Sequence, residues 1–307
     1  MESQHQDVPS EKSLERRKML LEGLGIVLCT KQKDGGFATF EDQIKLSEDL
    51  NLPSVQFDFR NREDDEFEKG LELIRLYKQT HPETVVSIHG ETPKINESDL
   101  SIKNTKRIDE ELNFIKEIGG ESYTVHPPSI NSKLFDSLPP ETKDSIIENY
   151  CSIFIDAIKA QSAKNDRFSV AIENMPTKGE DGSWGQKIEE IISLIKNIEA
   201  RLLQESFNPT EAKSHVGATL DINHALHGAN REDYEHILES WFKGLGEYLR
   251  VIHVYTPSQA DDSFNDKMML SLKFALQFNP NARLFVESKQ NPASTKEIYT
   301  RVKSSEK

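Results

Sequence analysis

Short runs of apolar residues alternate with longer amphipathic segments along almost the whole chain. Runs of this kind, rich in β-branched and aliphatic side chains, are typical of parallel strands that are covered on both faces. We predict eight strands: Leu24–Thr30, Ser54–Phe59, Thr84–His89, Ser122–His126, Phe168–Glu173, Val216–Asp221, Arg250–Val254 and Arg283–Glu287. Their starts recur every 30 to 48 residues, which leaves room for one helix and two short loops in each interval.

The segments between these strands carry the helical period of about 3.6 residues. The clearest examples are Phe67–Gln79, Ile108–Ile118, Ile146–Ala160 and Ile188–Leu203. Pro140 and Pro292 stand where helices commonly begin. Alternation of this kind predicts an α/β fold, a (β/α)8 TIM barrel. We expect residues 19–307 to form one barrel domain and residues 1–18 to form a flexible tail.

Six of the predicted strands have a side chain that can bind a metal ion at or near their carboxyl end. These side chains are His89, His126, Glu173, Asp221, His253 and Glu287, and His224 follows three residues after Asp221. The carboxyl ends of the strands of an α/β barrel converge on one face, so we expect these groups to lie close together. One such carboxylate alone is often a loop residue or an ion-pair partner. Several buried carboxylates on consecutive strands need a compensating cation.

The last four strands supply the predicted metal site, formed by Glu173, Asp221, His253 and Glu287. Three carboxylates and one imidazole suit Mn²⁺, Zn²⁺, Mg²⁺ or Co²⁺. His89 and His126 either complete a second metal position beside Glu173 or bind the substrate or a loop carbonyl through hydrogen bonds. We place His224 on the loop above its strand as a substrate-binding residue, with metal ligation and acid–base catalysis as the alternatives.

Two long loops follow the fifth and seventh predicted strands, at residues 174–185 and 255–265. Long loops on this face of a barrel are usually binding loops, although a solvated insertion is the alternative. Trp184 and Phe264 are candidate lid aromatics that contact the substrate, and plain packing is equally compatible with the sequence. Lys289 lies two residues beyond Glu287, so it is either a binding residue for an anionic substrate group or a solvated lysine.

Composition narrows the choice of partners. The chain has 52 acidic and 38 basic residues and a net charge of −14, which disfavours binding to nucleic acid. It has no apolar run of about 18 residues, so we expect no membrane span, and Met1–Arg17 lacks the apolar core of a secretory signal. Cys29 and Cys151 are too few for a disulfide framework, and we expect a cytoplasmic protein. Homo-oligomerisation stays open.

Several local motifs together resemble the xylose-isomerase-like barrel superfamily. This superfamily includes sugar isomerases and epimerases and the endonuclease IV type of apurinic-site nuclease. The resemblance covers roughly residues 25–303 and rests on His126-Pro127-Pro128-Ser129, Glu173-Asn174, Leu220-Asp221-Ile222-Asn223-His224-Ala225, His253 and Glu287, in that order. In the family, the residues that match Glu173, Asp221, His253 and Glu287 bind one divalent metal. Those that match His89 and His126 bind a second metal in the nuclease branch.

The chain departs from the nuclease branch after the seventh strand. That branch carries an Asp-x-His pair there, which holds a third zinc together with the equivalent of His224. Residues 254–266 of this chain contain acidic residues but no histidine. This departure and the negative charge favour a metal-dependent isomerase or epimerase of a sugar or sugar phosphate. An endonuclease IV-like phosphodiesterase, and a barrel that binds metal and ligand without turnover, stay open as alternatives.

The resemblance also implies roles for the two glutamates. In epimerase relatives, the pair that matches Glu173 and Glu287 exchanges protons on the two faces of one substrate carbon. We therefore expect Glu173 and Glu287 to form the acid–base pair on a carbohydrate substrate, and His224 to hold a substrate hydroxyl group.

Overall fold

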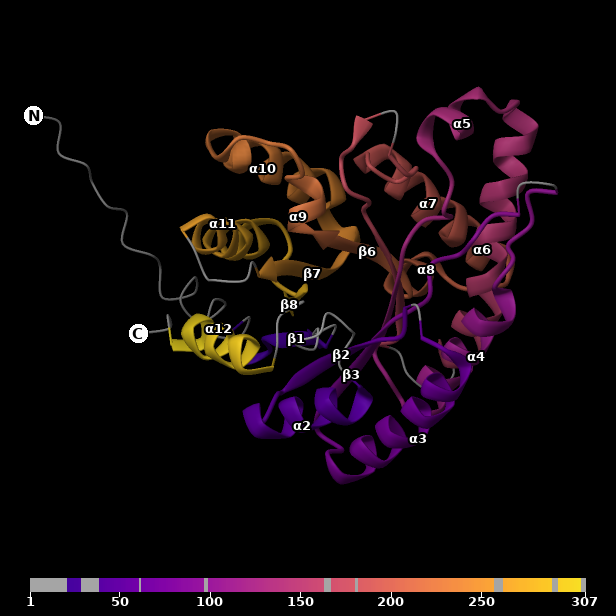
Figure 1. The fold of residues 1–307 in the computed structure, drawn as a ribbon. Coiled ribbons are helices and arrows are strands. Elements are labelled where there is room, and N and C mark those ends of the chain that lie inside the picture. Colours follow the sequence, from indigo (N-terminus) through magenta and orange to yellow (C-terminus); the bar gives the residue numbers. More distant parts are fainter. Residues whose placement is uncertain are drawn as a thin grey trace, which may run out of the picture.

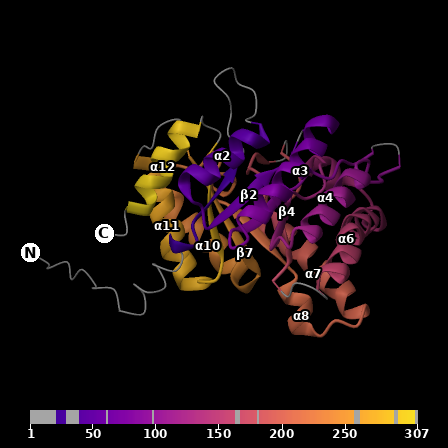
Figure 2. The ribbon, with the colours of Figure 1, turned by 90° about the horizontal axis from the view of Figure 1, so that it is seen from below.

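The chain folds into a closed barrel of parallel strands. The computed structural model describes residues 21–28, 39–60, 62–96, 99–162, 167–179, 182–256, 262–288 and 292–304. Within these ranges, each of the eight strands pairs with its neighbours in chain order, and β1 pairs with β8. Helices surround the strands (Figures 1 and 2). The predicted (β/α)8 barrel is therefore confirmed, whereas the predicted tail at residues 1–18 lies outside the described residues.

Strands and helices alternate as the hydrophobic pattern predicted. The strands are β1 (Gly25–Leu28), β2 (Ser54–Asp58), β3 (Val85–His89), β4 (Ser122–Val125), β5 (Ser169–Glu173), β6 (Val216–Asp221), β7 (Leu249–Thr256) and β8 (Arg283–Ser288). The helices are α2 (Phe40–Leu50), α3 (Asp64–Thr80), α4 (Thr105–Glu117), α5 (Ser132–Ser137), α6 (Pro140–Ser162), α7 (Ile188–Gln204), α8 (Pro209–Ser214), α9 (Ile222–Ala225), α10 (Tyr234–Leu245), α11 (Asp262–Phe278) and α12 (Pro292–Ser304). Two 3₁₀ helices, η2 (Arg231–Asp233) and η3 (Gly246–Tyr248), flank α10.

The predicted bounds of the second loop, residues 255–265, are wrong at both ends. Strand β7 continues to Thr256 because its ladder with β8 extends to the pair Thr256 and Ser288. Helix α11 already begins at Asp262. The polar composition of this segment therefore concealed the end of a strand and the first turn of a helix.

Side chains alternate between two environments along each strand. The outward set, which includes Ile26, Phe57 and Val125, packs with the surrounding helices into one large core. The inward set forms a second, small apolar cluster inside the barrel, made of Val27, Ala171, Val251 and Phe285. This alternation follows from the two-residue period of a β-strand.

Toward the carboxyl ends of the strands, the interior of the barrel becomes polar. Gln56 Nε2 donates a hydrogen bond to Thr124 Oγ1 at 2.9 Å, and this oxygen lies 3.1 Å from Thr219 Oγ1. The inward positions that follow on the odd-numbered strands are His89, Glu173 and His253, and those on the even-numbered strands are Asp58, His126, Asp221 and Glu287. Alternate strands fill successive layers of such barrels, so the last two layers hold the candidate site.

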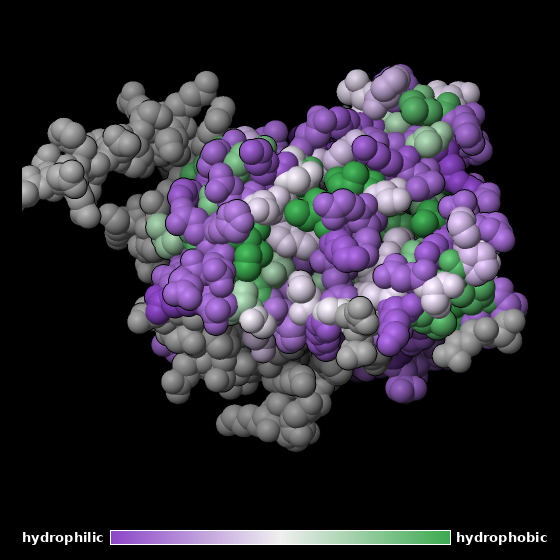
Figure 3. All heavy atoms as spheres, turned by 90° about the horizontal axis from the view of Figure 1, so that it is seen from above, coloured by the Kyte–Doolittle hydropathy of each residue, from purple (hydrophilic) through white to green (hydrophobic). Residues whose placement is uncertain are grey.

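The surface contrasts with this interior. The face drawn in Figure 3 is mostly hydrophilic, and its hydrophobic residues lie in separate groups. None of the described helices is both long enough and apolar enough to cross a bilayer.

Candidate metal centre

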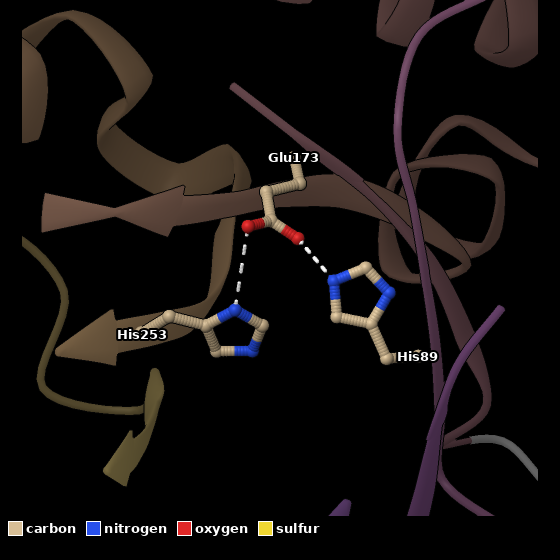
Figure 4. A group of neighbouring side chains, drawn as sticks. All are labelled: His89, Glu173 and His253. Carbon is tan, nitrogen blue, oxygen red and sulfur yellow. Dashed lines mark ion pairs between the residues drawn. The ribbon is translucent and has the colours of Figure 1, made fainter. Parts of the chain in front are cut away.

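Glu173, at the end of β5, lies at the centre of the polar layers. Its Oε2 is 2.7 Å from His89 Nε2 and 3.6 Å from His126 Nε2. Its Oε1 is 3.5 Å from His253 Nδ1 and 3.7 Å from His224 Nδ1. Figure 4 shows the carboxylate between the rings of His89 and His253, which come from β3 and β7. One carboxylate thus contacts four imidazoles from four different parts of the barrel.

The structure brings together the metal-binding residues that the sequence predicted. Three groups of side chains present ligand atoms that lie within 4.8 Å of one another: Glu173, Asp221, His253 and Glu287; His89, Glu173 and His253; and His126, Glu173 and His224. The first group is the predicted four-residue site. His89 and His126, which the sequence suggested for one second position, fall in two different groups, so the structure does not place both of them in a single group with Glu173. Glu173 belongs to all three groups, so any two metal positions built from them would share it.

Many polar atoms of this cluster are buried without a hydrogen-bond partner. Of the twelve such side-chain atoms in the described part of the chain, seven belong to His89, His126, Glu173 and His253. Buried polar groups normally have hydrogen-bond partners, and isolated buried charge is costly. Orphaned nitrogen and oxygen atoms that face one another are the donor set that a bound cation satisfies. The residues present therefore fit a divalent metal ion.

The ionisation of most of the cluster suits metal binding, and His253 is the exception: burial acts to lower its pKa, but Glu173 raises it above its ordinary value. Burial alone would raise the pKa of Glu173, but His89, His126 and His253 hold that pKa well below its usual range. Burial lowers the pKa of His126 well below its usual range. Burial also raises the pKa of Asp221 to about 6. At neutral pH the cluster therefore offers anionic carboxylates and a neutral His126 imidazole, which are the forms that ligate metals.

Hydrogen bonds from outside the cluster orient two of the histidines. Thr92 Oγ1 lies 3.0 Å from His126 Nδ1 and leaves Nε2 to face the site. His224 Nδ1 donates to the backbone oxygen of Asn174 at 2.8 Å, so Nε2 is the ring nitrogen that is left for a ligand or substrate. Contacts of this kind fix the tautomer and the ring orientation of metal-binding histidines.

Asn174 joins the carboxyl ends of β5 and β6. Its buried side chain accepts a hydrogen bond from the backbone nitrogen of Asp221 at 2.7 Å and donates one to the backbone oxygen of Asp221 at 3.1 Å. Asp221 Oδ1 in turn accepts from the backbone nitrogen of His224 at 2.8 Å and caps α9. The Glu173-Asn174 motif therefore positions the candidate ligand Asp221 of the next strand and also supplies the candidate ligand Glu173.

We expect Asn174→Ala to lower the free energy of unfolding of the metal-free protein. The substitution leaves the buried amide of Asp221 without its acceptor, which costs about 1–3 kcal/mol. Urea unfolding in the presence of a chelator measures the change. Asn197→Ala, which removes an exposed hydrogen bond within α7, is the matched control and should change stability by less than about 0.5 kcal/mol. Equal stability of the two variants would contradict the role given to Asn174.

Two residues of the site were missed in the sequence. Asp58 ends β2, is buried, and accepts hydrogen bonds from Arg60 at both oxygens, from Nε to Oδ1 and from Nη2 to Oδ2, each at 2.8 Å. Arg60 Nη2 also lies 3.5 Å from Glu287 Oε1. Although burial acts to raise the pKa of Asp58, Arg60 holds it at about 2. Asp58 is therefore an anion already paired with a guanidinium.

A signal for Asp58 was present in the sequence. Ser54, Gln56 and Asp58 share the two-residue period that faces the barrel interior. The predicted strand ended at Phe59, an outward residue of the core. Because the predicted strand has Phe59 as its last residue, the polar strand end at Asp58 is not apparent from the prediction.

The remaining predicted site residues have different outcomes. Trp184 is buried with its ring stacked on Phe135, 4.4 Å between centroids. Its position supports the packing alternative and gives no support to substrate binding. Phe264 is likewise buried, at the beginning of α11. Lys289 lies outside the described residues, so its role as an anion-binding residue stays a prediction.

Comparison with models of protein families finds no match, and neither does comparison with curated proteins. Solved structures do match. A putative xylose isomerase from Rhodospirillum rubrum is 13% identical with a TM-score of 0.62, covering 92% of this chain and 98% of the other. Endonuclease IV from Thermus thermophilus is 17% identical with a TM-score of 0.58, covering 92% and 98%. The chain has the fold of the xylose-isomerase-like barrels.

This fold accommodates several activities among the matching structures. D-allulose 3-epimerase from a Methylomonas species is 9% identical with a TM-score of 0.52, covering 87% of this chain and 83% of the epimerase. At identities of 9 to 17%, these likenesses show the fold alone. The activity of this chain therefore has to be argued from its own residues.

Proposed function

We propose that the chain is a divalent-metal-dependent enzyme that isomerises or epimerises a sugar or sugar phosphate by proton transfer next to a carbonyl group. The observation that carries this proposal is the buried group of Glu173, Asp221, His253 and Glu287, whose ligand atoms lie within 4.8 Å of one another. A metal ion held there would polarise the oxygen atoms of a substrate carbonyl or hydroxyl. The shared fold of D-allulose 3-epimerase adds support by analogy.

The two glutamates are not equally suited to moving the proton. Both oxygens of Glu173 face imidazoles, and its pKa lies well below the usual range. A carboxylate of such low basicity accepts a proton poorly, so Glu173 is better suited to be a fixed ligand. Glu287, beside Arg60 at the end of β8, is the better candidate for the general base. This changes the equal acid–base pair that the family resemblance implies.

His224 is the candidate for the partner on the other side of the substrate. Its side chain is 23% exposed, against 0% for Glu173 and His253. Its Nδ1 is held by the backbone oxygen of Asn174. The Nε2 atom can therefore bind a substrate hydroxyl or exchange a proton with it.

A second candidate function is the hydrolysis of a phosphate ester. The observation in its favour is the presence of His89 and His126 beside Glu173, which would give a second metal ion ligands and a bridging carboxylate. Sites with two metal ions suit phosphoryl hydrolysis, and endonuclease IV shares the fold. The net charge of −14 favours a small phosphate ester over duplex DNA as the substrate.

Incorporation of solvent deuterium tests the proposed reaction. We expect the metal-loaded protein to exchange the proton next to the carbonyl in one or more members of a panel of ketoses and ketose phosphates. Glu287→Gln should slow this exchange by about 10²–10⁴-fold if it removes the base. The comparison uses Glu287→Gln samples whose metal content has been measured as equal to that of the wild type. Glu117→Gln, an exposed partner of Arg75, is the control and should retain wild-type exchange.

Three other outcomes would favour the alternatives. Metal-dependent release of phosphate from small esters, without proton exchange, would favour the hydrolase. Cleavage of duplex DNA at abasic sites that is lost in Glu173→Gln would favour the nuclease. Full metal occupancy with neither reaction would favour a barrel that binds its ligand without turnover.

A further inference from the structure

Arg60 is an arginine whose side chain is mostly buried at the edge of the candidate site. It follows β2 at the carboxyl face of the barrel, and its side chain is 16% exposed. The Nε and Nη2 atoms together form a two-pronged contact with Asp58, each at 2.8 Å. The backbone nitrogen of Arg60 also donates to Asp58 Oδ1 at 3.1 Å. Side chain and backbone are therefore fixed by one buried carboxylate.

This contact leaves part of the guanidinium free. A guanidinium has five N–H donors in a planar fork, and its two edges can each hold one oxyanion. Asp58 occupies the Nε–Nη2 edge. On the other edge, Nη2 also donates a hydrogen bond to Glu287 Oε1 at 3.5 Å, so Nη1 is the nitrogen of that edge that remains available. In the part of the chain that the structure describes, Nη1 makes no hydrogen bond or ion pair.

Stability alone does not account for this pair. Replacing a buried ion pair by apolar residues of similar volume is often neutral or stabilising, because two charges must be removed from water. Asp58 occupies an inward position in the last layer of the barrel, yet it does not belong to any group of metal-binding side chains among the described residues. Its contacts serve to hold Arg60 at the rim of the centre.

We propose that Arg60 binds an anionic group of the substrate, a phosphate or a carboxylate, through Nη1 of its guanidinium. This inference rests on the proposed function and narrows it, because the substrate becomes an acidic sugar derivative. Nη1 carries two N–H donors in a fixed plane, which phosphate and carboxylate oxygens can accept, and the guanidinium stays charged at every accessible pH. The anionic group would lie next to Glu287, and the carbonyl end of the same molecule would reach the predicted metal ligands.

Binding of small probes to the metal-loaded protein tests this inference without reference to catalysis. The probes are inorganic phosphate, acetate and the neutral polyol xylitol, measured by isothermal titration calorimetry. We expect Arg60→Gln to weaken binding of phosphate, acetate or both by about 10- to 100-fold, the loss of one or two charge-assisted hydrogen bonds. Metal content and xylitol affinity should not change. Arg75→Gln, which removes the same charge from a pair on the outer helices, should leave all three affinities unchanged.

The probes distinguish the two kinds of anionic group. A loss confined to phosphate identifies a phosphate group, and a loss confined to acetate identifies a carboxylate. Arg60→Lys keeps the charge but loses the fork, so we expect it to fold and to bind the anion more weakly than the wild type. It carries the test if Arg60→Gln does not fold.

Several results would overturn the inference. They are wild-type protein that binds neither anion, anion affinity that is the same in wild type and in both Arg60 variants, and a loss of anion binding that is matched by loss of metal. The last result would mean that Arg60 only positions Glu287. Arg60-dependent anion binding without deuterium exchange would refute the proposed reaction but not the anion site. Exchange on anionic sugars that is as fast in Arg60→Gln as in the wild type would refute the anion site but not the reaction.

Discussion

Glu173→Gln should weaken the binding of Zn²⁺ or Mn²⁺ by more than about 100-fold. Loss of a residue that only supports a metal ligand costs about 10- to 100-fold in metal affinity, and loss of a ligand should cost more. Glu173 belongs to all three groups of side chains that can hold a metal ion, and it contacts His89 through Oε2 and His253 through Oε1. An amide keeps the shape of the carboxylate but removes its negative charge and one of its two ligand oxygens. Direct titration of chelator-treated protein, read by calorimetry, measures the loss.

Glu111→Gln is the matched control for this experiment. Glu111 is also a fully buried carboxyl group, but it lies on α4, where it accepts hydrogen bonds from Tyr123 Oη at 2.6 Å and from the backbone nitrogen of Glu91 at 3.0 Å. We expect its replacement to leave metal affinity within a factor of about 2–3 of the wild type, since changes without contact to the ligands are usually small. Wild-type affinity in Glu173→Gln would contradict the central place given to this residue.

Glu111→Gln should also change how stability depends on pH. Burial raises the pKa of Glu111 to about 8, from an ordinary value of 4.5. Because the folded-state pKa is above the unfolded-state pKa, the contribution to stability is fully present below pH 4.5 and is lost as the pH rises through about 8. At about 1.4 kcal/mol for each pH unit of difference, the loss amounts to roughly 4–5 kcal/mol.

A glutamine resembles the protonated acid and does not ionise, so this loss should be absent from the variant. We expect the free energy of unfolding of the wild type to fall between pH 5 and pH 9 by several kcal/mol more than that of Glu111→Gln. Urea unfolding of both proteins at a series of pH values measures the difference. Parallel pH profiles would show that Glu111 is not held protonated by the fold.

The barrel could be predicted from the sequence because two independent patterns agree. Strands such as β5 and β6 are nearly continuous apolar runs, which only a doubly covered sheet buries, and the helical segments between them keep one apolar face. The six polar strand ends then fall on one face by geometry. Glu173, Asp221, His253 and Glu287 lie together in the structure for this reason.

The features that the sequence did not reveal depend on side-chain contacts between distant positions. The pair of Asp58 and Arg60 looks like ordinary turn chemistry until the register of β2 shows Asp58 facing inward beside His89. Trp184 sits in a polar, glycine-rich loop, and its burial against Phe135 depends on how that loop folds back onto α5. Local composition carries no information on such contacts.

The central claim is that Glu173, Asp221, His253 and Glu287 share one divalent cation. An anomalous-difference map from a crystal soaked in Mn²⁺ or Zn²⁺, combined with metal analysis of the same protein, tests it most directly. We predict a peak about 2.0–2.4 Å from a ligand atom of each of the four residues. A second peak between His89 and His126 would support the two-metal hydrolase. The claim would be contradicted if a crystal soaked in excess metal showed no peak among the four residues. It would also be contradicted if their ligand atoms were more than about 6 Å apart.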